Sequence, residues 1–249
     1  MTFAIIAAGE GSRLSQEGIK LPKPLVRICG EPMIDRLIRL FNENGADKIC
    51  IIVNKLHAQT ETHVRKLMAR GEGAPIELAV QDTPSSMHSF SVLSPWLEQA
   101  PFCLTTVDTI FRETDFAEYI KAFRESNSDG MMGVTDFIDD EKPLYVGTDN
   151  NMNITGFYDE PQNCRYISGG LYALKPNALR TLSRCMEAGL SRMRNFQRGL
   201  VADGLKLKAY PMSKVLDIDH AQDIIKAETF LRSINKEDKT GQTSLNKLG

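Results

Sequence analysis

The residues best suited to chemistry lie in a loop near the start of the chain, directly after an apolar, strand-like run. The loop contains Gly9, Gly11 and Ser12, and it ends in a basic side chain at Arg13. Glycines allow backbone N–H groups to approach an anion closely, and successive amides of this kind form an anion-binding concavity. Arg13 can donate two parallel hydrogen bonds to phosphate oxygens, and Lys23 adds a compact positive charge. The pattern predicts a phosphate-binding loop.

Two common glycine motifs do not describe this loop. A Walker loop ends in a lysine followed by serine or threonine, and no such pair follows these glycines. A dinucleotide-binding fingerprint has a third glycine where this chain has Leu14, and it opens directly into a helix. We expect a long proline-containing segment, rather than a helix, after Gly11.

The run A-A-G-x-G-S-R-L over 7–14, followed by P-K-P-L over 22–25, resembles the signature of the sugar-1-phosphate nucleotidyltransferases. Enzymes of this family join the nucleotide part of an NTP to a phosphorylated sugar and release pyrophosphate. The resemblance extends over about residues 2–233 and implies an NTP and a phosphorylated small molecule as partners. It implies Arg13 and Lys23 as catalytic residues. The residues that it implies for nucleotide binding are Ala7, Ala8, Gly9, Gly11, Ser12, Gln81 and Ser86.

The resemblance also implies a Mg2+ ion held by two aspartates. Asp108 follows an apolar run where the family has a metal-binding aspartate, although Val107 stands where glycine is typical. The segment V-L-D-I-D-H over 215–220 implies Asp219 as the second ligand, with Asp217 as the alternative. Mg2+ prefers one or two carboxylates together with phosphate oxygens and water, so two aspartates suffice. Asp219 is also a suitable helix N-cap.

The match to the family is incomplete where the base would bind. Gln81 corresponds to a glutamine that contacts the base, but Ser86 stands where the family has a glycine. The sequence therefore leaves the choice of nucleobase open. An ordinary turn with a helix-capping serine explains Ser85 and Ser86 equally well.

The acceptor-binding half also departs from the family pattern. Glu160 stands where an E-K-P motif usually supplies a lysine for the sugar phosphate, so the resemblance implies Glu160 as an acceptor-binding residue. We consider Lys23, Lys214 or an arginine such as Arg192 as the replacement. Gly170 belongs to an S-G-G-L-Y segment, which resembles a family strand whose glycines leave room for the sugar. An unusual acceptor, such as a phosphorylated amine or polyol, is compatible with these changes.

Alternating apolar runs and helical periodicity indicate the elements that must position these residues. The N-terminal pattern predicts strands at 2–8, 49–53, 75–80 and 102–107, and helices at 32–43, 60–70, 86–96 and 115–126. This order predicts an α/β fold, a doubly wound and mostly parallel sheet flanked by helices, with ligands at the carboxyl ends of the strands. The family resemblance implies the same GT-A-like architecture. The loop at 9–13, Gln81 and Asp108 all follow such ends.

After Gly130 the pattern changes to shorter strands, with a small mixed-strand part for the acceptor. We expect strands at 131–137, 144–147, 154–158, 166–174, 205–210 and 215–218, a hairpin turn at 148–151, and helices at 176–186, 191–202 and 220–233. Residues 1–234 are predicted to form one domain, with a nucleotide-binding half at 1–128 and an acceptor-binding half at 129–234. The polar residues 235–249 are predicted to form a disordered tail.

Composition limits the classes of protein that fit. The net charge of −2 over 249 residues argues against a broad nucleic-acid surface, and no apolar run approaches the ~20 residues that span a bilayer. Five scattered cysteines without a C-x-x-C pair indicate reduced thiols and a cytoplasmic protein, and the four histidines form no ligand motif. The first residues lack the pattern of a signal peptide. The sequence is compatible with a homo-oligomer and does not specify one.

Two other functions remain open at this point. A glycosyltransferase that uses a nucleotide sugar would carry a D-x-D motif, and Asp217-Ile218-Asp219 has that form, although it lies near the end of the chain. The loop with Arg13 and Lys23 would then lack a purpose. A non-catalytic, nucleotide-binding regulatory subunit is the third reading, and the missing lysine at Glu160 is its best support.

Overall fold

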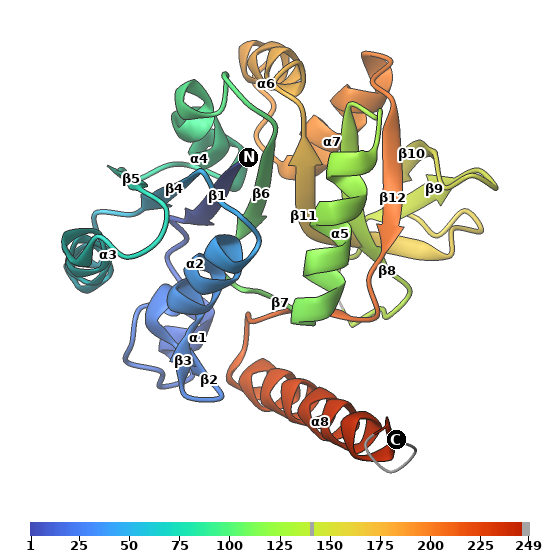
Figure 1. Ribbon diagram of the computed structural model, residues 1–249. Coiled ribbons are helices and arrows are strands. Elements are labelled where there is room, and N and C mark those ends of the chain that lie inside the picture. The colour runs from blue at the N-terminus through green and yellow to red at the C-terminus, as the bar shows by residue number, and fades with distance from the viewer. Residues whose placement is uncertain (140–141, 246–249) are drawn as a thin grey trace.

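A central sheet with helices on both faces forms the body of the molecule (Figure 1). The computed structural model describes residues 1–139 and 142–245, and over 234–245 it describes the backbone alone. The largest sheet within these residues has nine strands. The predicted α/β fold, with a mostly parallel central sheet and flanking helices, is confirmed, and the sheet is parallel throughout the half that precedes residue 107.

Four parallel strands form the N-terminal part of the sheet, in the order β6-β1-β4-β5. Their bounds are Thr2–Ala7 for β1, Lys48–Val53 for β4, Ile76–Val80 for β5 and Phe102–Thr106 for β6. Every residue of β1 and all but the first of β4 are buried, as expected for parallel strands covered on both faces. Because the strands are parallel, their carboxyl ends meet at one edge.

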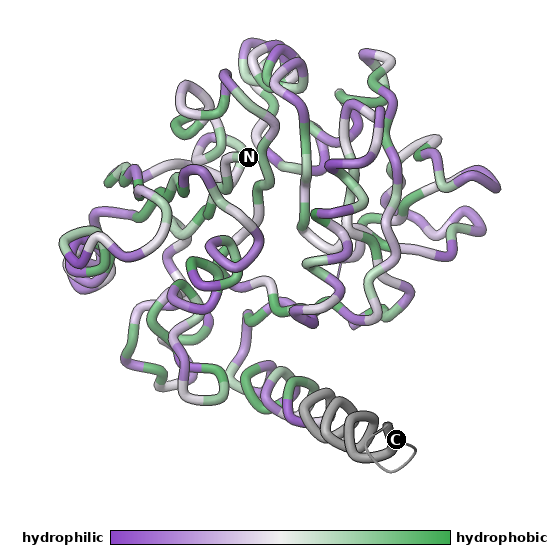
Figure 2. Tube along the Cα trace, viewed as in Figure 1, coloured by the Kyte–Doolittle hydropathy of each residue, from purple (hydrophilic) through white to green (hydrophobic). Residues whose placement is uncertain are grey.

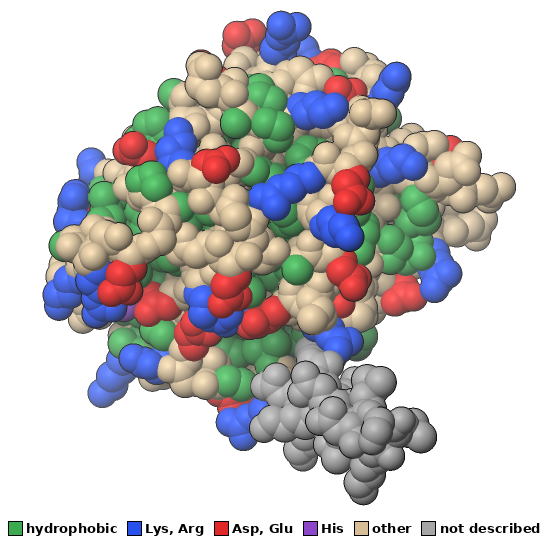
Figure 3. Space-filling view, in the orientation of Figure 1, with side chains coloured by type: hydrophobic (Ala, Val, Ile, Leu, Met, Phe, Trp, Pro, Cys, Tyr) green, Lys and Arg blue, Asp and Glu red, His purple; other side chains and the backbone are tan. Residues whose placement is uncertain are grey.

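Side chains alternate between the two faces of β1 and enter two separate cores. Phe3 and Ile5 pack with helices α2 (Met33–Glu43) and α5 (Glu113–Glu125), whereas Ala4 and Ile6 pack with α4, α6 and α7 on the opposite face. These three helices span Ser86–Leu93, Ala178–Glu187 and Met193–Ala202, and α3 spans Ala58–Arg70. Figure 2 shows the apolar residues concentrated along the strands and the inward sides of the helices. The exposed face in Figure 3 carries interspersed acidic and basic side chains.

The second part of the sheet is mixed and joins the first through β11 (Tyr166–Leu174). This strand runs antiparallel to β6, to β8 (Gly130–Thr135) and to β9 (Tyr145–Thr148), and Ile167 pairs with β8 on one edge and with β9 on the other. β10 (Ile154–Tyr158) pairs with β9, and β12 (Leu207–Pro211) pairs with β8. The predicted hairpin turn between β9 and β10 is confirmed, because the Asp149 carboxylate accepts hydrogen bonds from the backbone N–H groups of Asn151 and Asn153.

A separate two-stranded ladder brings the end of the chain to the edge of the main sheet. β7 (Thr109–Phe111) pairs antiparallel with β13 (Val215–Asp217), which leads into α8 (Ala221–Leu245). The Ile218 N–H donates to the Asp108 carbonyl at 3.2 Å. Short elements complete the N-terminal part: 3-10 turns at Lys23–Leu25 and Ser94–Trp96, and a small hairpin of β2 (Arg27–Ile28) and β3 (Glu31–Pro32).

Two expectations about helices differ from the structure. The segment after Gly11 was expected to contain no helix, and this was wrong: the five-residue helix α1 (Ser12–Gln16) begins at once. Gly11 serves as its N-cap in a left-handed conformation, and the first proline of the segment comes only at Pro22. The last helix continues past its expected end near 233, because no proline interrupts the sequence up to Leu245.

The predicted division of the chain stays a prediction, as does the disorder of the tail. For residues 246–249 that prediction falls outside the described residues. None of the helices within the described ranges is both long and apolar enough to cross a membrane.

The hydroxyl group of Tyr119 connects α5 to two strands and generates a stability prediction. It is fully buried, donates to the Met131 carbonyl on β8 and accepts from the Ala173 N–H on β11, both at 2.7 Å. We expect Tyr119→Phe to lower the free energy of unfolding by about 1–3 kcal/mol, since two buried backbone groups lose their partner. Urea denaturation measures the change. The matched variant Tyr145→Phe, at a partly exposed tyrosine, should stay within ~0.5 kcal/mol of wild type. Equal effects of the two substitutions would contradict this account.

Candidate active site

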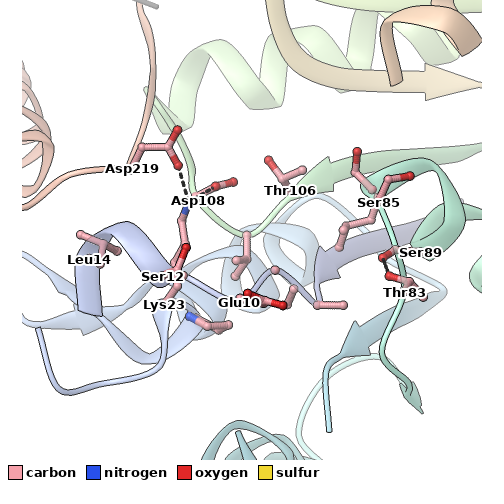
Figure 4. A pocket seen from close by; sticks show the side chains of 18 of the residues that line it. Glu10, Ser12, Leu14, Lys23, Thr83, Ser85, Ser89, Thr106, Asp108 and Asp219 are labelled. Carbon is pink, nitrogen blue, oxygen red and sulfur yellow. Dashed lines mark hydrogen bonds and ion pairs between the residues drawn. The ribbon is translucent and has the colours of Figure 1, made fainter. Parts of the chain in front are cut away.

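A cavity of about 430 Å3 opens at the carboxyl ends of β1 and β6 (Figure 4). Its walls come from the ends of β1 and β6, from the segments that follow these strands, from the first part of α4 and from Asp219. The carboxylates of Asp108 and Asp219 lie toward one end, and the hydroxyls of Thr83, Ser85 and Ser89 lie toward the other. The residues that line it are 6–14, Lys23, Pro24, 83–86, Ser89, 106–108 and Asp219.

The glycine loop adopts the conformation that its sequence requires. Gly11 has a φ of +65°, and a Cβ atom at this position would lie 3.0 Å from the Cβ of Lys23. A side chain there would be strained by its backbone conformation and would press on the lysine. The buried Asn54, which follows β4, fixes the loop from the other side by donating from its side-chain amide to the Gly9 carbonyl at 2.9 Å.

Four charged side chains that the sequence analysis singled out lie together in this cavity. The Lys23 ammonium lies 2.5 Å from Oδ2 of Asp108 and 2.8 Å from Oδ1 of Asp219. Arg13 donates from Nη1 to the other oxygen of Asp219 at 2.9 Å. Asp219 is thereby joined to residues that precede it by 196 and 206 positions. The fold has therefore assembled two cations and two carboxylates from three distant segments.

The surroundings of this cluster keep Lys23 and Asp219 charged. Burial by itself would lower the pKa of Lys23, but the Asp108 and Asp219 carboxylates outweigh burial, so that the pKa is raised. Burial would likewise raise the pKa of Asp219, but Lys23 and Arg13 outweigh it and the pKa is lowered. Oδ1 of Asp108 is buried and has no hydrogen-bond partner among the described residues. One acceptor in the cluster thus remains available for a cation or a donor.

Of the two residues expected to contact the nucleobase, only one lines the cavity. Ser86 lines the cavity, whereas Gln81 is exposed and lies outside the lining. Thr83 and Ser89 line the same end, and their hydroxyls are hydrogen-bonded at 2.6 Å. Sequence reasoning missed Ser89, although its four-residue spacing from Ser85 places the two serines on one side of α4.

The alternative interpretation of Ser85 as a helix cap is confirmed. The Ser85 side chain accepts a hydrogen bond from the backbone N–H of His88 and caps α4. The capped end of α4 therefore faces the cavity, with Ser86 as its first residue.

A second cavity of about 430 Å3 lies beside the first, and Arg13 and Asp219 line both. Its walls come from β11, β13, α7 and α8, with Ser168 and Gly169 on β11 and Asp217 on β13. The two residues predicted for the acceptor do not line it: Glu160 is exposed, and Gly170, with a φ of +70°, lies against the side chain of Thr109.

The cations considered as replacements for the missing lysine also lie elsewhere. Lys23 belongs to the first cavity, the ammonium group of Lys214 lies 3.9 Å from the centre of the Phe137 ring, and Arg192 is exposed outside the second cavity. The basic side chains that line the second cavity are Arg13, Lys142, Arg194 and Lys226, together with His220. Sequence reasoning identified only Arg13 among these five side chains, because no motif marks the other four.

Comparisons with known proteins bear on the family and the fold of this chain. A family model described as nucleotidyl transferase matches residues 3–233. Mannose-1-phosphate guanyltransferase 2 of Candida glabrata is 27% identical over 190 residues, which is 72% of this chain and 51% of that protein. The chain thus spans about half the length of this curated relative.

Two solved structures share the fold. A candidate glucose-1-phosphate thymidylyltransferase from Bacillus anthracis superimposes with a TM-score of 0.80 at 18% identity, covering 93% of this chain and 95% of that one. The inositol-1-phosphate CTP transferase from T. maritima gives a TM-score of 0.73 at 19% identity, covering 89% and 90%.

The two loop glycines provide a matched test of the local geometry. We expect Gly11→Ala to lower the free energy of unfolding by about 1–2 kcal/mol, because it forces a side chain into a left-handed conformation against Lys23. Gly9→Ala should have little effect on stability, since an added Cβ meets no atom within 4 Å. Urea denaturation of both variants measures the difference. If Gly9→Ala proved the more destabilising, this description of the loop would be wrong.

Proposed function

The chain belongs to the nucleotidyl transferase family, and from this premise we propose that it transfers a nucleoside monophosphate from an NTP to a phosphorylated small molecule. Pyrophosphate is the second product. The observation that carries the proposal is the pair of adjacent cavities with Arg13 and Asp219 in their common wall. The first cavity suits the NTP and the second suits the acceptor, so that the reacting groups meet where the two cavities adjoin.

The proposed reaction is an in-line displacement at the α-phosphorus. An oxygen of the acceptor phosphate forms a bond to this phosphorus, and the bond to the bridging oxygen breaks, so that pyrophosphate leaves with the electron pair. A phosphate monoester has a second pKa near 6 and is mostly dianionic at neutral pH, so the attacking oxygen needs no general base. Catalysis then depends on positioning and on stabilising charge.

The ion pairs in the first cavity suit these tasks. Arg13 is about half exposed, lies at the junction of the cavities and can hold the leaving β- and γ-phosphates. Lys23 is more buried and can stabilise the α-phosphate as negative charge accumulates there. Both cations already face carboxylates, so a bound phosphate would compete with existing partners rather than order mobile side chains.

We further propose Mg2+ as cofactor, with Asp108 and Asp219 as its ligands. Carboxylate oxygens are the ligands that this hard cation prefers, and the buried Oδ1 of Asp108 has no partner among the described residues. Asp217, the alternative from the sequence, lines the second cavity only. When bound, such an ion would neutralise phosphate charge and orient the NTP.

The residues of the two cavities also bear on the two alternative functions, a glycosyltransferase and a regulatory subunit. Asp217 and Asp219 both line the second cavity, as a D-x-D motif of a glycosyltransferase could. That reading leaves the cluster of Arg13, Lys23 and Asp108 without a role. A regulatory subunit would have no need to retain this cluster, so its presence favours an enzyme.

A screen for pyrophosphate release tests the proposal directly. Four NTPs are crossed, in the presence of Mg2+, with phosphorylated sugars, phosphorylated polyols and choline phosphate. We expect one productive pair, which would also identify both substrates. Release of nucleoside diphosphate from a nucleotide sugar, with no pyrophosphate from any pair, would favour the glycosyltransferase. Silence in protein that binds an NTP by calorimetry would favour the regulatory subunit.

Substitutions in the cluster should reduce turnover while the protein stays folded. We expect Lys23→Ala and Arg13→Ala each to lower kcat/KM by about a hundred- to thousand-fold, the usual effect of removing one donor to a developing charge. Initial rates of pyrophosphate release measure the change, with circular dichroism as the check on folding. The control is Lys20→Ala, since Lys20 is exposed and lies outside both cavities. Near-wild-type turnover in Lys23→Ala would refute its assigned role.

The proposed metal dependence has its own test. Chelation with EDTA should abolish pyrophosphate release, and added Mg2+ should restore it. Asp108→Asn should raise the Mg2+ concentration needed for half-maximal rate, because it removes one charged ligand. A rate insensitive to EDTA would show that the two carboxylates serve only as partners of Lys23.

A further inference from the structure

Among the basic residues that line the second cavity, Arg194 is held in place by the most specific contacts. It lies in the first turn of α7 and lines the cavity. Its Nη1 lies 2.5 Å from Oδ1 of Asp159, directly after β10, and its Nη2 donates to the Lys142 carbonyl at 3.1 Å. A guanidinium has five N–H donors, and the described residues accept two of these. Arg194 is therefore held in place with donors to spare.

The charge around Asp159 is unbalanced in favour of the cations. Arg198, one helical turn after Arg194, lies 2.7 Å from the other oxygen of the same carboxylate. A single negative charge thus faces two guanidinium groups. Arg198 also donates to the Phe157 carbonyl and does not line the cavity, so it anchors the helix to β10. The surplus positive charge is presented to the cavity by Arg194.

Two other cations of this cavity, Lys226 and Arg13, are matched by carboxylates within it. Lys226 lies 2.8 Å from Asp139 and 3.4 Å from Asp223, and Arg13 is paired with Asp219. All three of these aspartates line the cavity. Arg194 differs from these two cations because its carboxylate partner lies outside the lining and is shared with Arg198.

Resting on the proposed function, we propose that Arg194 binds the phosphate group of the acceptor and that Asp159 positions it. Guanidinium and phosphate form forked, charge-assisted hydrogen bonds, which suit a ligand defined by its phosphate. Glu160, where a lysine was expected for this task, is exposed and outside the cavity. The positive charge reaches the acceptor from α7 instead. The site therefore favours phosphorylated acceptors over their neutral parent compounds.

Steady-state kinetics test this assignment, with the NTP and acceptor that the screen for pyrophosphate release identifies. We expect Arg194→Gln to raise the KM for the acceptor about ten- to a hundredfold and to leave the KM for the NTP unchanged. Arg194→Lys should recover part of the loss, because it keeps the charge without the fork. An unchanged acceptor KM, or an equal rise in both KM values, would overturn the proposal.

Two neighbouring arginines serve as controls. Arg192→Gln removes an exposed charge two residues away, outside the cavity, and should leave the acceptor KM unchanged. Arg198→Gln removes the other partner of Asp159 and should raise the acceptor KM far less than Arg194→Gln does. An equal rise in Arg198→Gln would show that anchoring of α7, and not contact with phosphate, explains the effect.

A direct binding measurement keeps this inference separate from the reaction. Wild type, Arg194→Gln and Arg192→Gln are titrated with inorganic phosphate by calorimetry at constant ionic strength. We expect Arg194→Gln to weaken phosphate binding about tenfold or more and Arg192→Gln to match wild type. If wild type turns over no substrate pair, the proposed function fails, yet this titration still decides the role of Arg194. Equal phosphate affinity in all three proteins would overturn the inference.

Discussion

The ammonium group of Lys23 between the carboxylates of Asp108 and Asp219 is the interaction on which the rest of the site depends. A buried amine stays charged only beside opposite charge, and here the two carboxylates raise its pKa despite burial. Removing one partner from such a buried cluster is costly, because the remaining charge stays desolvated. The cluster therefore constrains the segments after β1, after β6 and after β13 to meet at one place.

The backbone supplies this meeting place before any side chain acts. Parallel pairing of β1 with β6 brings their carboxyl ends together, and the antiparallel ladder of β7 and β13 carries Asp219 to the same edge. Gly11 adds the close approach that Lys23 requires. As a result, the two cavities adjoin at Arg13 and Asp219.

Sequence patterns predicted the elements well where burial determines them. The apolar runs that became β1 and β4 are buried almost throughout, and α3 ends at Arg70 as predicted, with Gly71 in a left-handed conformation at its C-cap. The prediction failed where a short local conformation decides: α1 has five residues, too few for helical periodicity to be recognised. The sequence did not reveal side-chain direction in loops either: Gln81 was chosen to contact the nucleobase, but it does not line the first cavity.

The acceptor side shows why motif matching reaches a limit. A cavity that binds a phosphate requires positive charge at a position in space, and several elements can deliver it. Glu160 and Arg194 are 34 positions apart in the sequence, yet Asp159, next to Glu160, holds Arg194 through an ion pair. The carboxylate of Asp159 thus links the motif position at Glu160 to Arg194 on α7. In the role proposed for Arg194, α7 supplies the positive charge that the segment after β10 lacks. Only the fold brings this helix close to that segment.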